Sequence, residues 1–373
     1  MTGRTATAES PPPRLVTLRS GGWLLGVAVG LVLAVVIWRT VVIWQSLSVR
    51  VVGDGAHVAS YGFDLSTCLV PRAQIVAAGF PKDGLPILAP PTALTVAGVG
   101  ELTREMRARH QGRFLVDSDA VIGVTIGGQA RAYPLRVLTW HEVVNDELDG
   151  VPIAVTYNPL CSSAAVLGRR VGGETLTFGV SGLLYNSNLL LYDRRASGAG
   201  ESLWSQLQFR ALAGPAAAKG ARLEVLPMAV MRWRDWKAAH PETTVLAPDA
   251  ALVKVYKRTY GEYFGSQTLR FPVAPLPNGS LPLKTSVIAL RPAQRWHAFT
   301  WDQVGARANA AGVWETNLDG RTLRFLYRRD PALVGNPAAV WVEPADERPA
   351  PPTVYSFWFA WYAMHPDEAG LAR

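Results

Sequence analysis

An internal sequence repeat constrains the fold of this chain more than any other feature of its sequence. The segment from Val121 to Tyr133 resembles the segment from Val287 to Phe299, at an offset of 166 residues (287 − 121). The segments Leu148 to Tyr157 and Leu318 to Tyr327 each read Leu-Asp-Gly and reach a tyrosine seven positions after the glycine. Their offset is 170 (318 − 148), so an insertion of four residues in the intervening loop accounts for the difference. The echo predicts two copies of a hairpin-helix-strand unit, with chance similarity over few matched positions as the alternative.

Local patterns predict a β-rich chain. Gly127-Gly128 separates two alternating runs, as in a β-hairpin. We expect a helical turn over Leu138 to Asp146, a strand over Val151 to Tyr157 and an amphipathic helix over Met228 to His240. A second hairpin is expected around Gly172-Gly173. The predicted fold class is α+β and β-rich, with mixed or antiparallel sheets and short helices, and a core that explains most of the 13 tryptophans.

The N-terminal region predicts a membrane anchor. No charged residue occurs from Ser20 to Trp38, and about 20 apolar residues are needed for a helix to cross a bilayer. The exit of this stretch offers no small-residue cleavage site, which favours an uncleaved anchor over a signal peptide. Three arginines precede the stretch and two follow it, which favours a cytoplasmic N-terminus. We therefore expect a single-pass protein of the cell membrane, with its main part outside the cytoplasm.

Composition shifts divide the chain into five expected parts. These are a cytoplasmic tail at 1–19, a transmembrane anchor at 20–44, a turn-rich lead-in at 45–110, a first repeat unit at 111–275 and a second repeat unit with an aromatic C-terminal segment at 276–373. The net charge of +8 comes from scattered arginines with no basic run. Because polyanion binding needs clustered charge, nucleic acid is not an expected partner.

The repeat also separates scaffold from a candidate site. The Asp-Gly turn and the strand tyrosine occur in both copies and are expected to be structural. Several polar residues of the first copy have no counterpart in the second: His141, Glu142, Asn145, Asp146, Asn158 and Cys161. On the expected helix, His141 and Asn145 share one face and Glu142 and Asp146 another. The turn after Tyr157 would present Cys161 toward that helix.

These residue types suit two kinds of chemistry. Histidine, cysteine and carboxylate side chains bind transition metals and also serve nucleophilic catalysis. His141 and Cys161 are the candidate metal ligands. For catalysis, Cys161 is the candidate nucleophile, His141 the base, and Asn145 or Asp146 the orienting group. The opposing interpretation is a packed histidine beside an inert buried thiol. Candidate ligand-binding residues are Arg131, Tyr133, His141, Glu142, Tyr157, Asn158, Ser181 and Asn186.

At the same residues the chain resembles a known family. The shared motifs are Arg131-Ala-Tyr-Pro134, His141-Glu142-x-x-Asn145-Asp146, Phe178 to Ser187, Tyr192-Asp-Arg194, Ser202 to Gln206 and Trp236 to Pro241. Together they are similar to domain-of-unknown-function family 3179, from about Phe63 to the aromatic segment ending at Trp361. The resemblance implies a bacterial protein with an export or membrane signal. It implies no reaction, because the family has no established activity.

One position departs from that family's pattern. The turn after the strand usually reads Tyr-Cys-Pro-Leu, whereas this chain has Asn158 in place of the first cysteine. The change removes a Cys-x-x-Cys pair and disfavours a dithiol or two-thiolate role. We therefore expect a metal- or small-ligand-binding module, with a Cys161-dependent enzyme and a structural or interaction domain as the alternatives. The identity of a small ligand or a protein partner is not specified by the sequence.

Overall fold

The computed structural model describes residues 22–47, 51–257, 259–279, 281–330 and 338–367. The chain divides into two compact units, Met1–Val51 and Val52–Arg373. The expected tail at 1–19 and the first two residues of the expected anchor lie outside the described residues.

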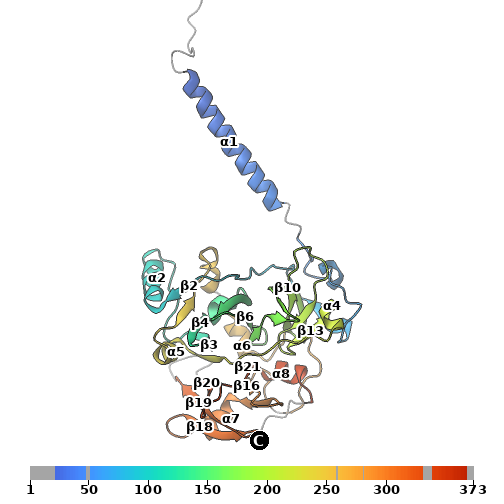
Figure 1. Cartoon of the computed structure of the whole chain (residues 1–373), viewed down its shortest axis with the longest axis vertical. Coiled ribbons are helices and arrows are strands. Elements are labelled where there is room, and N and C mark those ends of the chain that lie inside the picture. Colours follow the sequence, from blue (N-terminus) through green and yellow to red (C-terminus); the bar gives the residue numbers. More distant parts are fainter. Residues whose placement is uncertain (1–21, 48–50, 258, 280, 331–337, 368–373) are drawn as a thin grey trace, which may run out of the picture. The chain divides into compact units, whose positions relative to one another are not determined.

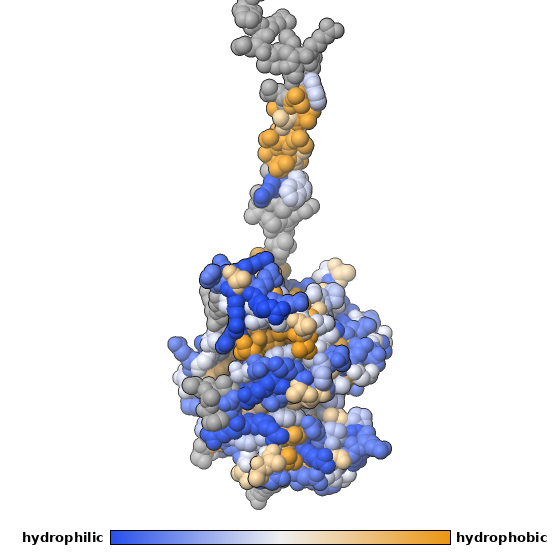
Figure 2. Space-filling model, turned by 90° about the vertical axis from the view of Figure 1, so that its left-hand side faces the viewer, coloured by the Kyte–Doolittle hydropathy of each residue, from blue (hydrophilic) through white to orange (hydrophobic). Residues whose placement is uncertain are grey.

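The N-terminal unit contains one helix, α1 (Gly22–Leu47). The described apolar side chains between Trp23 and Trp38 are exposed, with Leu31 and Trp38 each 63% exposed, and they form a hydrophobic surface on this part of the helix (Figure 2). In the part of the chain that the structure describes, no helix combines the length and the apolar character needed to cross a bilayer. The transmembrane segment at 20–44 stays a prediction.

The larger unit is built from β-sheets with short helices, which confirms the predicted α+β class. The eight-stranded sheet has the order β18 (Val313–Leu318), β19 (Arg321–Arg329), β20 (Ala338–Pro344), β14 (Ala229–Arg232), β3 (Ala120–Ile126), β4 (Gln129–Pro134), β15 (Thr244–Leu246) and β2 (Ala93–Thr95). The six-stranded sheet has the order β17 (His297–Thr300), β16 (Ser286–Leu290), β21 (Thr353–Phe357), β7 (Ser163–Gly168), β6 (Val151–Asn158) and β5 (Val143–Leu148). The pairing is antiparallel, except that β4 and β15 run parallel.

A five-stranded sheet completes the unit. Its order is β1 (Ile75–Ala77), β10 (Phe178–Tyr185), β11 (Asn188–Asp193), β12 (Leu203–Ser205) and β13 (Arg210–Ala213), and β8 (Arg170–Val171) pairs with β9 (Glu174–Thr175) beside it. The helices are α2 (Val96–Ala108), α3 (Leu135–Leu138), α4 (Pro215–Ala218), α5 (Trp233–Ala239), α6 (Gly261–Gly265), α7 (Trp301–Arg307) and α8 (Trp358–Met364). Short 3-10 turns are η2 (Val58–Tyr61), η3 (Arg72–Gln74), η4 (Ala250–Leu252) and η5 (Val255–Lys257). In Figure 1, the eight-stranded sheet extends from β18 at one end of the unit to β2, beside α2, at the other.

The six-stranded sheet is the middle layer. One hydrophobic cluster joins it to the eight-stranded sheet, with Ile122 and Ile288 among its members. A second cluster joins it to the five-stranded sheet, with Ala154 and Phe178 among its members. Because both faces are covered, every residue of β7 and β21 is buried and the usual alternation disappears. The layering places β5 next to β10.

The two Asp-Gly turns lie where the sequence predicts them. Asp149-Gly150 joins β5 to β6 and Asp319-Gly320 joins β18 to β19, and all four residues have positive φ. Two consecutive residues with positive φ define the type I′ turn, whose twist matches that of the strands. The Asp-Gly dipeptide adopts this conformation at low cost, because glycine lacks a Cβ and aspartate tolerates the left-handed region.

The two copies of the repeat are present and follow the same path. The first copy runs β3, β4, α3, β5, β6 and the second runs β16, β17, α7, β18, β19. Their registers match: Leu148 pairs with Val151 in the first copy and Leu318 with Arg321 in the second, an offset of 170 for both partners (318 − 148 and 321 − 151). In each copy a second hairpin follows the helix, where only a strand is predicted.

The copies exchange strands between the two large sheets. The first copy places β3 and β4 in the eight-stranded sheet and β5 and β6 in the six-stranded sheet, whereas the second copy does the reverse. The bridge between Val230 of β14 and Val340 of β20 has its equivalent in the bridge between Tyr355 of β21 and Ala164 of β7. The core segments of the two sheets are therefore related by an internal pseudo-two-fold, and each sheet contains strands of both copies.

A third pair of similar segments lies outside the repeat predicted from the sequence. α5 and α8 share the pattern Trp-x-x-Trp-x-x-x-His-Pro, at an offset of 125 residues (358 − 233). The second tryptophan and the histidine lie ring against ring in both, with centroids 4.1 Å apart for Trp236 and His240 and 4.0 Å apart for Trp361 and His365. α5 follows β14, which pairs with β3, and α8 follows β21, which pairs with β16. These two strand pairings have the same register.

Three predicted elements need correction. The helix predicted over 138–146 does not form: α3 ends at Leu138, Glu142 adopts a left-handed conformation (φ 55°), and the β-branched Val143 and Val144 begin strand β5. The helix predicted over 228–240 is strand β14 followed by α5. The hairpin at Gly172-Gly173 exists but pairs only β8 with β9.

Candidate functional site

The strand at 143–148 changes how the predicted site is arranged. His141 and Glu142 lie in the turn before β5, and Asn145 and Asp146 lie within the strand, where successive side chains point to opposite faces. The predicted pairing of His141 with Asn145 and of Glu142 with Asp146 on helix faces is therefore wrong. Each side chain has a separate environment.

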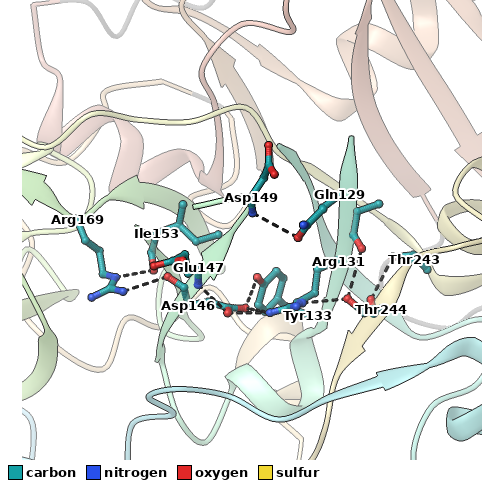
Figure 3. A network of polar contacts seen from close by, with 11 residues as sticks. Gln129, Arg131, Tyr133, Asp146, Glu147, Asp149, Ile153, Arg169, Thr243 and Thr244 are labelled. Atoms are coloured by element: carbon teal, nitrogen blue, oxygen red, sulfur yellow. Dashed lines mark hydrogen bonds and ion pairs between the residues drawn. The ribbon is translucent and has the colours of Figure 1, made fainter. Parts of the chain in front are cut away.

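Asp146 belongs to a buried network that joins the two large sheets (Figure 3). Nη1 of Arg131, on β4, donates to both carboxylate oxygens of Asp146 at 2.7 and 2.6 Å. The Tyr133 hydroxyl donates to Oδ2 at 2.7 Å, and Arg169 donates to the Asp146 carbonyl at 3.1 Å. Burial and the neighbouring Asp146 charge hold the pKa of Tyr133 well above its usual range. These saturated contacts give Arg131, Tyr133 and Asp146 a scaffold role in the structure.

Three other predicted site residues bond to the main chain. The Asn145 side-chain amide donates to the Phe178 carbonyl and accepts from the Phe178 amide, each at 2.8 Å, and so links β5 to β10. Ser181 donates to the Leu190 carbonyl at 2.6 Å within the five-stranded sheet. Asn186 accepts from the Ala274 amide at 2.9 Å. Such bonds satisfy buried backbone groups and leave these side chains little capacity for a ligand.

His141 is fully buried and both of its ring nitrogens are hydrogen-bonded. Nδ1 lies 2.5 Å from the Pro86 carbonyl oxygen and Nε2 lies 2.7 Å from the Tyr256 hydroxyl. A carbonyl only accepts, so Nδ1 carries the proton and Nε2 accepts from Tyr256, whose oxygen in turn accepts from the Asp249 amide at 3.0 Å. Burial lowers the pKa of His141. The ring is therefore a neutral group that joins three segments.

Cys161 is also fully buried. Its Sγ donates to the Ser187 carbonyl at 3.2 Å, and its amide donates to Oδ1 of Asn158 at 3.2 Å. Burial strongly raises the pKa of the thiol, which opposes formation of the reactive thiolate. Cys161 and Cys68 are both free thiols. Among the described residues, no three His, Cys, Asp or Glu side chains are gathered so that they could hold a metal ion.

Glu142 and Asn158 have a different setting, because both line a pocket. Nδ2 of Asn158 donates to Oε1 of Glu142 at 3.2 Å. The Glu142 backbone is in the left-handed region, at a cost of roughly 1–2 kcal/mol for a residue with a Cβ. Burial raises the pKa of Glu142 to about 8, against a smaller lowering by the Asn158 hydrogen bond. The carboxyl group is therefore largely protonated at neutral pH.

The pocket around these two side chains, called here the Glu142 pocket, has a volume of about 300 Å³. Binding pockets for small molecules span roughly 300–1,000 Å³ and are mostly apolar with a few placed polar groups. The apolar walls include Phe80, Leu85, Leu160, Val180, Leu183, Leu184, Leu189 and Phe271. The polar side chains besides Glu142 and Asn158 are Thr139, Trp140, Tyr260 and Arg270. Trp140 is half-buried, and its indole Nε1 is buried without a hydrogen-bond partner.

Sequence reasoning found only part of this pocket. Glu142 and Asn158 were predicted as ligand-binding residues, whereas Trp140, Tyr260 and Arg270 were missed. Tyr256, Tyr260, Tyr263 and Phe264 form an aromatic run around η5 and α6, and that run is the signal that was available. Tyr157, another predicted residue, is buried and does not line the pocket, and burial raises its pKa to about 12.

A family model described as "Protein of unknown function (DUF3179)" matches residues 82–344, well over half of the chain. The chain belongs to this family. No curated protein and no solved structure matches the chain. The DUF3179 match contains Glu142, Asn158 and Arg270, and it is shorter at both ends than the extent that the sequence motifs suggested.

Asn158 has a clear structural role in the turn after β6. The Asn158 side chain accepts from the Cys161 amide and donates to Glu142, so one residue closes the turn and fixes the buried carboxyl group. A cysteine has neither the carbonyl acceptor nor the strong donor for these two bonds. In this DUF3179 member the turn therefore supports a polar pocket floor.

Proposed function

We propose that the Val52–Arg373 unit is a binding module that holds a small organic molecule in the Glu142 pocket. The observation that carries the proposal is that the residues lining one apolar pocket include a buried carboxyl group, Glu142, and a tryptophan, Trp140, whose buried indole N–H has no partner. A buried donor without a partner costs about 1–3 kcal/mol, a penalty that a bound acceptor would remove.

The experiment is a ligand-observed NMR screen of the full chain with a mixture of neutral, cationic and anionic small molecules. The matched control is Ala78→Phe, because Ala78 lines the pocket and the larger ring would fill it. We expect compounds that bind the parent chain and not the filled variant, at an unchanged melting temperature. An absence of binders, or equal binding to both chains, would overturn the proposal.

We also propose that α1 attaches the protein to a membrane. The support is the charge-free sequence from Ser20 to Trp38 and the exposed apolar side chains of α1, including Val32 and Trp38. Exposed apolar surface of this kind favours an interface with lipid. Expression of the full chain and of a chain carrying Leu31→Glu and Val32→Glu, followed by separation of membrane and soluble fractions, tests the proposal. Equal recovery of both chains in the soluble fraction would contradict it.

A further inference from the structure

We propose that the Glu142 pocket takes a small monocarboxylate with an apolar body, an inference that rests on the binding function proposed above. The argument concerns the hydrogen-bonding character of the pocket's polar groups and the charge near them. Glu142, Asn158, Trp140 and Arg270 each offer a donor, whereas the Thr139 hydroxyl already donates to the Leu135 carbonyl at 2.7 Å. Among the described residues, Arg270, the one cationic group that lines the pocket, has no acidic partner.

Arg270 supplies the cationic group. It is exposed, and its guanidinium lies 5.3 Å from the Tyr260 ring centroid and 4.9 Å from the Tyr263 ring centroid. Among the described residues, Arg270 forms no ion pair with an acidic side chain. Stacking on two rings orients the planar guanidinium and leaves its N–H groups free for a carboxylate, which it binds through two parallel hydrogen bonds.

Glu142 and Asn158 supply donors deeper in the pocket. Oε1 of Glu142 already accepts from Asn158, so the proton of the neutral carboxyl group is available on the other oxygen. Asn158 uses one amide hydrogen in that bond and keeps the second. The buried Nε1 of Trp140 adds a third donor without a partner. A ligand group that only accepts hydrogen bonds suits this set.

The buried Glu142 and the exposed Arg270 both lie near the Tyr260 phenol. The pKa of Tyr260 is raised by burial first and then by Glu142, and it is lowered by Arg270, so both groups act on one phenol. The Trp140 and Tyr260 rings are also neighbours, with centroids 6.4 Å apart. Leu160 and Leu184 belong to one hydrophobic cluster with Tyr263, and they give the pocket apolar surface besides these polar groups. A carboxylate head with a short apolar body satisfies both surfaces.

The test compares three probes of the same length that differ in head group: hexanoate, hexanamide and hexylamine. Isothermal titration with the full chain at pH 7 gives the three dissociation constants. We expect hexanoate to bind at least tenfold more tightly than hexanamide, and hexylamine to bind most weakly because Arg270 repels it. Arg270→Gln removes the preference for hexanoate. Arg307→Gln is the matched control, since Arg307 is also exposed and lies over an aromatic ring, Trp314, outside the pocket.

The outcomes separate this inference from the binding function. Equal affinity for hexanoate and hexanamide, or a preference for hexylamine, overturns the carboxylate assignment, and sensitivity of that binding to Ala78→Phe then still supports the pocket. Failure of all three probes overturns the carboxylate assignment as well, and the NMR screen decides the binding function independently. Loss of hexanoate preference in Arg307→Gln as well as in Arg270→Gln contradicts the role of Arg270.

Discussion

Nδ2 of Asn158 donates a hydrogen bond to Oε1 of Glu142 at 3.2 Å. Glu142 lies in the turn before β5, and Asn158 is the last residue of β6. The bond holds a buried carboxyl group against an apolar pocket, where burial raises its pKa. The proposed ligand chemistry depends on this protonated carboxyl group.

Binding of a carboxylate should therefore depend on pH. The pKa of Glu142 is about 8, raised by burial, so the group donates a hydrogen bond below that pH and becomes a buried anion above it. We expect the affinity for hexanoate to be constant from pH 6 to 7 and to fall by up to about tenfold per pH unit above 8. Glu142→Gln retains a donor and cannot ionise, so its affinity should stay constant over the same range.

The other ionisable groups near Glu142 do not account for this pH dependence. Burial raises the pKa values of Tyr157, Tyr260 and Cys161, so these groups remain neutral in the same window. A pH dependence that persists in Glu142→Gln would show that another group is responsible.

Asp146→Asn should destabilise the protein without changing ligand affinity. The substitution leaves Arg131 in a mostly buried position without its counter-charge, since the two side chains are 16% and 6% exposed. Breaking a buried pair in this way costs about 3–5 kcal/mol of unfolding free energy. Urea denaturation measures it. Glu315→Gln, which removes an exposed pair with Arg324 on neighbouring strands, should cost less than about 1 kcal/mol. Similar losses for both variants would contradict the scaffold role of Asp146.

His365 should make stability depend on acid pH. Burial lowers its pKa from 6.5 to about 4, while its ring stacks on Trp361 and bonds to the Leu207 carbonyl. The unfolded chain takes up a proton near pH 6.5 and the folded chain only near pH 4, so stability is lost as the pH falls between those values. The loss approaches roughly 3 kcal/mol. Urea denaturation from pH 7 to 4 should show a smaller decline for His365→Gln than for the parent, and an equal decline would refute the assignment.

Cys161 should be unreactive in the folded protein. Its thiol is fully buried and burial raises its pKa, whereas Cys68 is half-buried. Treatment with iodoacetamide at pH 8, followed by mass spectrometry of the peptides, should show alkylation of Cys68 first and of Cys161 only after denaturation. Alkylation of Cys161 ahead of Cys68 would instead favour a Cys161-dependent enzyme.

The hairpins and the repeat were predictable because their signals are local. Two residues with positive φ need glycine or aspartate, so Asp149-Gly150 and Asp319-Gly320 are visible in sequence. The exchange of strands between the sheets was not predictable, because it depends on pairing over long separations, as between Val230 and Val340. The Trp-x-x-Trp-x-x-x-His-Pro echo was available in the sequence and confirms the same duplication by a separate pattern.

The candidate site was located only in part. Glu142 and Asn158 were predicted as site residues because the second copy lacks them, and both line the Glu142 pocket. His141, Asn145 and Asp146 are also absent from the second copy, but they bond mainly to scaffold groups. A polar residue that occurs in one copy only can also bond to the five-stranded sheet or to a neighbouring segment. Arg270 and Tyr260 come from the excursion around α6, and no local pattern relates that excursion to residues more than 100 positions earlier.

The most direct test of the central claim is the NMR signal of the Trp140 indole N–H during titration of the full chain with hexanoate, assigned by its loss in Trp140→Phe. Trp140, Trp301 and Trp361 each have a buried Nε1 without a partner, and only Trp140 lines the Glu142 pocket. We predict a saturable downfield shift of the Trp140 signal as its N–H gains an acceptor, with the Trp301 and Trp361 signals unchanged. A Trp140 signal that stays fixed at saturating hexanoate, or three signals that move together, would contradict binding in this pocket.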